Sequence, residues 1–208
     1  MSRHLRGLGY RTYRSTIHAN VGCTLEASQA LERRIETIAL KRGRKVTIVG
    51  HSLGGLLARG IAARRPDLVD GIVTLGSPIL APGAAHPILL FDLLVLTRLQ
   101  RAGLGRMMGE DCTSGTCARE SWEQSQVPLA RGVGFTSVFS RRDGIVDWRS
   151  CLDPQAKTVE VRTSHLGMAF DPVVLDVVTD TLAANRARRT RELSRQARLA
   201  VVPDASVG

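Results

Sequence analysis

The chain has 208 residues, of which 43% are hydrophobic and 23% charged, and its formal net charge at pH 7 is +10. A soluble globular chain of this length fits one domain with a sizeable core. The positive charge is mostly dispersed arginine without interleaved aromatic residues, which argues against a nucleic-acid-binding protein. The apolar runs are shorter than the roughly 18 residues that a membrane span needs.

The first part of the chain predicts alternating helices and strands. The opening MSRHLRGLGY reads as the end of a helix, and Arg11–Ile17 predicts a short strand. Apolar residues at helical spacing predict a helix over Thr24–Arg42, which Gly43 ends. Three further elements follow in the order strand, helix and strand: Val46–Val49, Leu53–Arg65 and Gly71–Leu75.

Between Ser77 and Gly132 the strand pattern breaks down, and the segment carries prolines, glycines and a strongly apolar patch. We interpret residues 78–132 as an inserted helical cap, with an ordinary pair of packing helices as the alternative. Two strands and a helix follow, the helix with Asp171 as its N-cap and Pro172 at its first position: Phe135–Ser140, Thr158–Arg162 and Asp171–Asn185.

Strands that alternate with helices predict an α/β fold, with a mostly parallel sheet covered by helices on both faces. We assign residues 1–185 to this domain and residues 186–208 to a basic tail. The tail carries six arginines between Arg186 and Arg198, which predicts a helix extension that frays into a disordered end. Contact of the tail with an anionic membrane surface or with nucleic acid is the alternative.

The stretch VTIVGHSLGGLLARG (residues 46–60) places a serine between glycines where a predicted strand passes into a predicted helix. Gly50-His51-Ser52-Leu53-Gly54 fits the G-x-S-x-G nucleophile elbow. In such a turn the serine takes strained backbone angles, and side chains at both flanking glycines are expected to clash with the strand and helix. The hydroxyl then lies at a helix N-terminus, where negative charge is stabilised. The alternative is a glycine-rich turn without catalytic function.

A nucleophilic serine needs a base that is oriented by an acid. Of the five histidines, His165 follows the last predicted strand, where a loop at the carboxyl edge of the sheet carries it to Ser52. His51 adjoins Ser52, but its side chain is expected to point away from the serine. The other three lie in the opening helix, after the first strand and in the cap: His4, His18 and His86.

The acid is expected between the serine and the histidine in chain order. VFSRRDGIVDWRS follows a predicted strand and offers Asp143 and Asp147. We favour Asp143, because it comes soon after the strand, in a turn with Gly144. Asp147 is the alternative acid, or a turn carboxylate paired with Arg149.

Four cysteines are spaced in no zinc-binding pattern. Cys112 and Cys117 frame the turn-rich CTSGTC, which predicts a local disulfide or, as the alternative, two thiols in a loop. Parity alone suggests Cys23 with Cys151 as a second pair.

Four segments between Lys45 and Met168 resemble alpha/beta-hydrolases, more narrowly bacterial lipases and esterases, including the GPI inositol-deacylase type: VTIVGHSLGGLLAR, VDGIVTLGSP, FSRRDGIVDW and SHLGM. The resemblance implies Ser52 as nucleophile, Asp143 as acid and His165 as base. It implies that the backbone N–H of Leu53 donates to the oxyanion, and that an ester is hydrolysed through an acyl-enzyme without a metal or organic cofactor.

The resemblance also implies an earlier strand and glycine-containing loop that supply a second oxyanion donor. Nothing before Tyr10 matches them, so we expect the natural chain to begin upstream. The opening residues lack a signal peptide's apolar segment, which makes a cytoplasmic location the default and the cell envelope or exterior the alternative.

The apolar cap favours small-molecule or lipid esters, especially of acyl chains, as substrates. An acyltransferase or amidase would use the same three residues. A truncated hydrolase fold kept as a binding module is the non-catalytic alternative.

Overall fold

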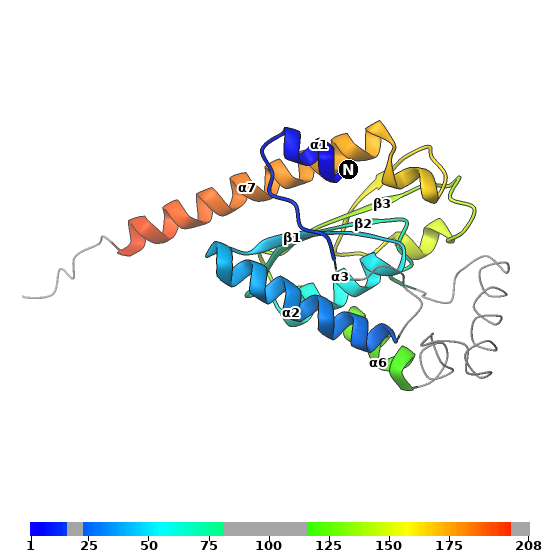
Figure 1. Ribbon diagram of the computed structural model, residues 1–208, viewed down its shortest axis with the longest axis horizontal. Helices are drawn as coiled ribbons and strands as arrows, with labels where there is room; N and C mark the ends of the chain where they lie inside the picture. Colours follow the sequence, from blue (N-terminus) through cyan, green and yellow to red (C-terminus); the bar gives the residue numbers. More distant parts are fainter. Residues whose placement is uncertain (16–22, 81–115, 201–208) are drawn as a thin grey trace, which may run out of the picture.

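The computed structural model describes residues 1–15, 23–80 and 116–200, which form an α/β fold (Figure 1). The described helices are α1 (Ser2–Gly7), α2 (Thr24–Arg42), α3 (Leu53–Arg64), α6 (Thr116–Gln126) and α7 (Pro172–Ala200). The strands are β1 (Val46–His51), β2 (Val69–Leu75), β3 (Gly134–Phe139) and β4 (Lys157–Glu160), and two short 3-10 helices are η1 (Trp148–Cys151) and η2 (Leu166–Ala169).

The described strands form one parallel sheet in the order β1-β2-β3-β4, as the alternation of strands and helices predicted. Helices α2, α3 and α6 lie on one side of the sheet, and α1 and α7 lie on the other (Figure 1). Because the strands are parallel, their carboxyl ends meet at one edge, and the loops that follow β1, β3 and β4 open there.

The core has one apolar cluster on each face of the sheet. The completely buried strand β2 serves both, since side chains alternate along a strand. Ile72 packs with the α2 and α3 side chains, whereas Val73 and Leu75 pack with those of α1 and α7. The sheet is therefore held between two helical layers.

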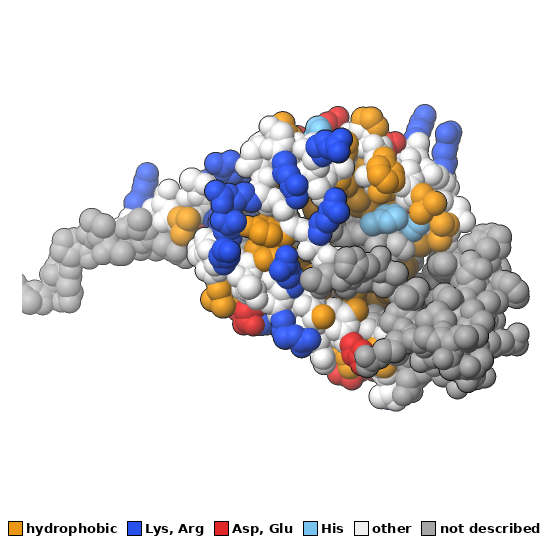
Figure 2. Space-filling model, viewed as in Figure 1, with side chains coloured by type: hydrophobic (Ala, Val, Ile, Leu, Met, Phe, Trp, Pro, Cys, Tyr) orange, Lys and Arg blue, Asp and Glu red, His pale blue; other side chains and the backbone are white. Residues whose placement is uncertain are grey.

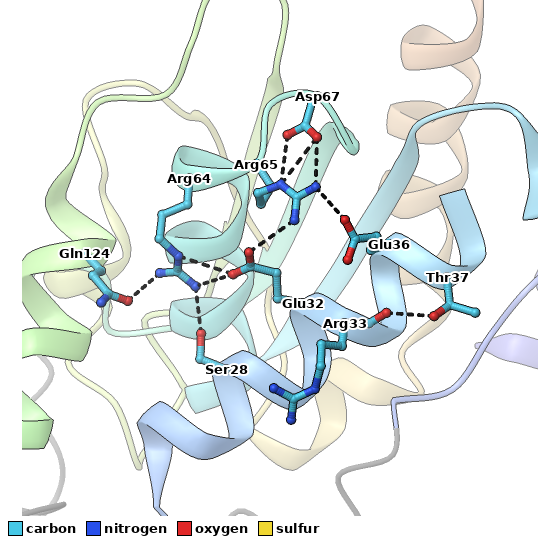
Figure 3. A network of polar contacts seen from close by, with 9 residues as sticks. All are labelled: Ser28, Glu32, Arg33, Glu36, Thr37, Arg64, Arg65, Asp67 and Gln124. Carbon is cyan, nitrogen blue, oxygen red and sulfur yellow. Dashed lines mark hydrogen bonds and ion pairs between the residues drawn. The ribbon is translucent and has the colours of Figure 1, made fainter. Parts of the chain in front are cut away.

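A network of charged side chains joins α2 to the end of α3 (Figure 3). Arg64 lies 3.0 Å from the Glu32 carboxylate, and Arg65 lies 3.0 Å from Glu36. Arg64 also donates to the Ser28 hydroxyl at 2.9 Å. Each partly exposed ion pair contributes little to stability by itself, but the shared partners set how α2 lies against α3.

A buried ion pair ties the middle of α3 to the loops on its other side. Arg59 Nε lies 3.0 Å from Asp153 Oδ2, and the two side chains are only 3% and 5% exposed. The same guanidinium donates to the Val127 carbonyl at 2.6 Å and to Gln155 Oε1 at 2.9 Å. All three nitrogens of the buried guanidinium therefore have acceptors.

The predicted strand at Arg11–Ile17 is wrong for its described part, because Arg11–Ser15 have no regular secondary structure and residues 16–17 lie outside the described ranges. A strand needs a partner ladder, and β1 does not pair with this segment. A cavity of about 1010 Å³ lies along β1 instead, lined in part by this segment.

Basic side chains line much of this cavity, and Figure 2 shows lysines and arginines gathered on this face of the molecule. Among the cavity's lining residues are eight basic ones: Arg11, Arg14, Arg34, Arg42, Arg44, Lys45, Arg186 and Arg189.

The C-terminal helix begins as predicted, with Asp171 Oδ1 accepting from the N–H of Val173 at 2.8 Å. Residues 186–200, the part of the tail predicted to extend this helix, continue α7. The structure gives a reason: Arg188 donates to the Asp70 carbonyl at 2.6 Å, and Arg189 lies 3.1 Å from the Asp70 carboxylate. Residues 201–208 lie outside the described ranges.

Most of the predicted cap also lies outside them, at residues 81–115. Its last part contains α6, which packs against α3 and α2. In the portion of the chain that the structure describes, no helix combines the length and apolarity needed to cross a bilayer.

Candidate active site

Ser52 occupies a sharp turn between β1 and α3. Its backbone has φ +54° and ψ −127°, and it is the one residue other than glycine with positive φ among the described residues. Its N–H donates to the Leu75 carbonyl of the neighbouring strand at 2.9 Å. The strained backbone predicted for the elbow is therefore present, held by the sheet on one side and by the helix on the other.

Close packing requires two glycines in this turn, but not the two that the motif predicted. A Cβ on Gly50 would lie 2.5 Å from the Gly54 carbonyl oxygen, as expected. At Gly54 itself the expected clash is wrong, because nothing lies within 4 Å of a built Cβ. The crowded position is the next one, Gly55, where a Cβ would overlap the Ser77 side chain. Gly54 instead lines the cavity along β1.

Asp143 and His165 form a buried pair at the carboxyl edge of the sheet. His165 Nδ1 lies 2.7 Å from Asp143 Oδ2, and these side chains are 4% and 3% exposed. The His165 N–H also donates to the Asp143 carbonyl at 3.0 Å. Because an ionised carboxylate only accepts, Nδ1 carries the proton and Nε2 keeps its lone pair, as a general base requires.

The second oxygen of Asp143 is also fixed. Oδ1 accepts from the N–H groups of Ile145 at 2.9 Å and Val146 at 2.6 Å. Burial opposes ionisation, but the hydrogen bonds from His165, Val146 and Ile145 together lower the pKa of Asp143 below its usual value. The acid is therefore held in its charged form and in one orientation.

Asp147, the alternative acid, has a different environment. Its side chain is 47% exposed and lies 3.4 Å from Arg149 Nη1. Its Oδ1 accepts from the Arg149 N–H at 3.0 Å, which caps η1. This is the turn carboxylate paired with Arg149 that the sequence analysis gave as the alternative.

No hydrogen bond joins Ser52 Oγ to His165 within the described residues, but β2 connects the turn at Ser52 to the Asp143–His165 pair. Gly76 directly follows Leu75, to which Ser52 is hydrogen-bonded, and a Cβ on Gly76 would lie 3.1 Å from His165 Nδ1 and 2.8 Å from Asp143 Oδ2. No local sequence pattern marks Gly76 as part of the site.

His51, the residue before Ser52, contacts His165. The ring centroids lie 4.6 Å apart, and His51 Nε2 lies 2.9 Å from the His165 carbonyl oxygen. The contact was not predicted from the sequence, from which His51 was expected only to point away from Ser52. His4 is exposed on α1, and His18 and His86 lie outside the described ranges.

Leu53, the predicted oxyanion donor, is the first residue of α3. N–H groups in the first turn of a helix lack partners within the helix, so the Leu53 N–H, in the residue after Ser52, has no acceptor within α3. Within the described residues no group of three or more histidines, cysteines or acids is placed to hold a metal ion.

The described part of the chain tests one of the two expected cysteine pairings. Cys23 Sγ lies 3.1 Å from Cys117 Sγ, although the two residues are 94 positions apart in the sequence. The pairing of Cys23 with Cys151 is wrong, because Cys151 is buried and forms no disulfide. Burial, aided by the charge of Asp143, raises the pKa of the Cys151 thiol to about 12, so it is protonated at neutral pH. Cys112 lies outside the described ranges.

A parallel sheet between helical layers, with a strained serine after one strand and an aspartate–histidine pair after two others, defines an alpha/beta-hydrolase arrangement. The chain belongs to the alpha/beta hydrolase fold family, whose model matches residues 4–107.

Solved structures agree with this fold. The mature lipase BlEst2 of Bacillus licheniformis matches with a TM-score of 0.58 and 15% identity, over 78% of this chain and 75% of that one. A structure from a study of carboxylesterases of the thaumarchaeon Nitrososphaera gargenis matches with a TM-score of 0.56 and 15% identity, over 89% of this chain and 84% of that one. A serine hydrolase from the bacterium Cycloclasticus zankles matches with a TM-score of 0.54 and 11% identity, over 84% of this chain and 76% of that one.

Proposed function

We propose that the protein is a serine hydrolase that cleaves carboxylic esters through an acyl-enzyme. The observation that carries the proposal is the buried hydrogen bond between Asp143 and His165, 2.7 Å long, beside the strained turn at Ser52. The similar structures include a lipase and a protein studied among carboxylesterases, which favours esters over other acyl compounds.

In this mechanism His165 Nε2 takes the proton of Ser52 Oγ as the oxygen attacks the ester carbonyl. The carbonyl π electrons move to its oxygen, and the N–H of Leu53 donates to the resulting oxyanion. Asp143 stabilises the imidazolium and keeps its orientation. His165 then protonates the leaving alkoxide. The acyl-enzyme is hydrolysed by the same steps, with water in place of the serine.

Apolar side chains beside the base support acyl esters as the substrate class. Three residues shortly after His165 are exposed although they are hydrophobic: Leu166 (68%), Phe170 (78%) and Val173 (58%). A cluster of exposed apolar side chains is expected where an apolar ligand binds. We assign these residues as the candidate contact surface for the acyl chain of the substrate.

A fluorophosphonate probe tests the proposal, because it reacts only with an activated serine. The wild-type protein should form one covalent adduct on Ser52, located by peptide mass spectrometry, and should hydrolyse a short p-nitrophenyl ester. Ser52→Ala should lose both, with turnover falling by several orders of magnitude. Ser194→Ala, at an exposed serine on α7, is the matched control and should keep both.

Near wild-type turnover in Ser52→Ala would overturn the assignment of the nucleophile. A wild-type protein that neither reacts with the probe nor hydrolyses esters would instead favour the non-catalytic binding module. Transfer of the acyl group to an added alcohol in preference to water would indicate an acyltransferase.

A further inference from the structure

The contact between His51 and His165 connects two residues that lie 114 positions apart in the sequence. His51 is the last residue of β1 and is half-buried. A carbonyl oxygen can only accept, so the 2.9 Å contact is a hydrogen bond in which His51 Nε2–H donates to the His165 carbonyl. The two rings also pack at 4.6 Å between centroids with an interplanar angle of 38°.

Three groups of His165 are hydrogen-bonded to other residues. Its N–H and its Nδ1–H both donate to Asp143, at 3.0 Å and 2.7 Å. Its carbonyl oxygen accepts from His51. Asp143 therefore binds the backbone N–H and the Nδ1–H of His165, and His51 binds its backbone carbonyl.

His51 is also covalently attached to Ser52. It thus provides a short connection between the turn that presents the nucleophile and the loop that presents the base. The main alternative connection runs through Leu75 and Gly76, and a glycine offers no side chain to hold an imidazole. The His51 contact therefore joins the backbone at Ser52 to the backbone and ring of His165.

We propose that His51 is a positioning residue, which holds the carbonyl group and the ring of His165 so that Nε2 of the base faces Ser52. This inference rests on the proposed function of Ser52 and His165. His51 does not touch the reacting atoms, and it acts through the base.

The contact places a restriction on charge. When His165 accepts the serine proton, its imidazolium lies against the His51 ring. A second positive charge there would oppose proton transfer, so His51 must be neutral. Burial, followed by the charge of His165, lowers the pKa of His51, while the hydrogen bond to the His165 carbonyl and the charge of Asp143 act in the opposite direction. His165 and Asp143 are the titratable groups that act on His51 in the described structure.

Two substitutions distinguish the effect of the His51 hydrogen-bond donor from the effect of its aromatic ring. His51→Gln keeps an N–H donor at similar reach and has no charge, whereas His51→Phe keeps an aromatic ring and loses the donor. His4→Ala, at the exposed histidine on α1, is the control. Each variant is measured by kcat and KM on a p-nitrophenyl ester, by thermal unfolding, and by NMR titration of the His165 imidazole with labelled histidine.

We expect His51→Phe to lower kcat by about 10- to 100-fold at unchanged KM, because small displacements of a catalytic group have costs of this order. The midpoint of the His165 titration should shift in the same variant. His51→Gln should keep kcat within about 3-fold of the wild type and restore the wild-type midpoint, and His4→Ala should change neither.

An unchanged His165 titration in His51→Phe would overturn the proposal, even if kcat fell, because the loss would then come from folding. If the wild-type protein neither hydrolyses esters nor reacts with fluorophosphonate, the proposed function fails independently. The titration still decides in that case: a shifted midpoint supports the coupling of the two histidines, and an unchanged one refutes it.

Discussion

Gly76→Ala is expected to disrupt the pair formed by Asp143 and His165 without replacing any residue to which a catalytic role is assigned. Gly76 follows β2 with φ +53°, and its N–H donates to the Val138 carbonyl at 2.9 Å. A Cβ there would lie 2.8 Å from Asp143 Oδ2, 3.1 Å from His165 Nδ1 and 3.2 Å from Met168 Sδ. The carboxylate is buried and hydrogen-bonded at both oxygens, so it has no free direction in which to move.

The expected loss has two parts. A non-glycine residue at this φ costs about 1–2 kcal/mol in backbone energy. For a chain of this size that corresponds to a decrease in Tm of about 2–8 °C. The second part is displacement of Asp143 and His165 by a fraction of an ångström or more, for which a fall in kcat of about 10²-fold is expected.

Gly43→Ala isolates the first part. Gly43 caps α2 with φ +58°, nearly the same angle, and nothing lies within 4 Å of a built Cβ. Gly76→Ala should therefore lose at least as much stability as Gly43→Ala in thermal unfolding, and only Gly76→Ala should lose ester turnover and react slowly with fluorophosphonate. Equal kcat in the two variants would refute the steric reasoning.

Three further outcomes are expected from the charged groups. Asp143→Asn should lower turnover on the order of 10⁴-fold by leaving the base in the wrong tautomer, whereas Asp147→Asn should have a much smaller effect; the opposite ranking in steady-state kinetics would move the acid to Asp147. The free energy of unfolding, from urea titrations between pH 8 and 3, should decrease as pH falls. The folded-state pKa of His51 is lowered, so the free energy that neutral His51 contributes to folding is complete above the unfolded-state pKa of about 6.5 and is lost as the pH falls below it. The lowered pKa of Asp143 adds a second loss of stability below about pH 4. His51→Gln should remove the first loss, and a stability curve unchanged by this substitution would contradict the assignment. Arg59→Met should destabilise the protein by about 3–5 kcal/mol because it leaves Asp153 charged and buried, and the double variant Arg59→Met/Asp153→Leu should recover most of the loss in the same urea assay; a double variant no more stable than Arg59→Met would contradict this.

Local signals were sufficient for much of the fold. Helix α2 runs over Thr24–Arg42 as predicted, because its apolar period and its capping Gly43 are both encoded within the segment. The strained turn at Ser52 was predictable from the residues around it. Asp143 and His165 followed from their places after predicted strands, since a parallel sheet brings such loops to one edge.

The errors occurred where the structure depends on distant residues. Arg11–Ser15 has strand-forming residues but no ladder partner, and a strand requires one. Gly55 is crowded by Ser77, across the elbow, so the sequence motif could not distinguish it from Gly54. The contact of His51 with His165 spans more than half of the chain and leaves no local pattern.

The two halves of helix α7 should differ in how easily they open, although both are hydrogen-bonded as one helix. Its first half is buried through Val174 and Val178, and Arg189 is still paired with Asp70, but residues 191–195 are exposed. Figure 1 shows the last turns extending past the sheet. A helical segment without tertiary contacts is marginally stable in water. Amide hydrogens of the first half should therefore exchange only through large-scale unfolding, while those after Arg191 exchange through local fraying. Trypsin should cut first in this arginine-rich end and leave the sheet and its serine intact.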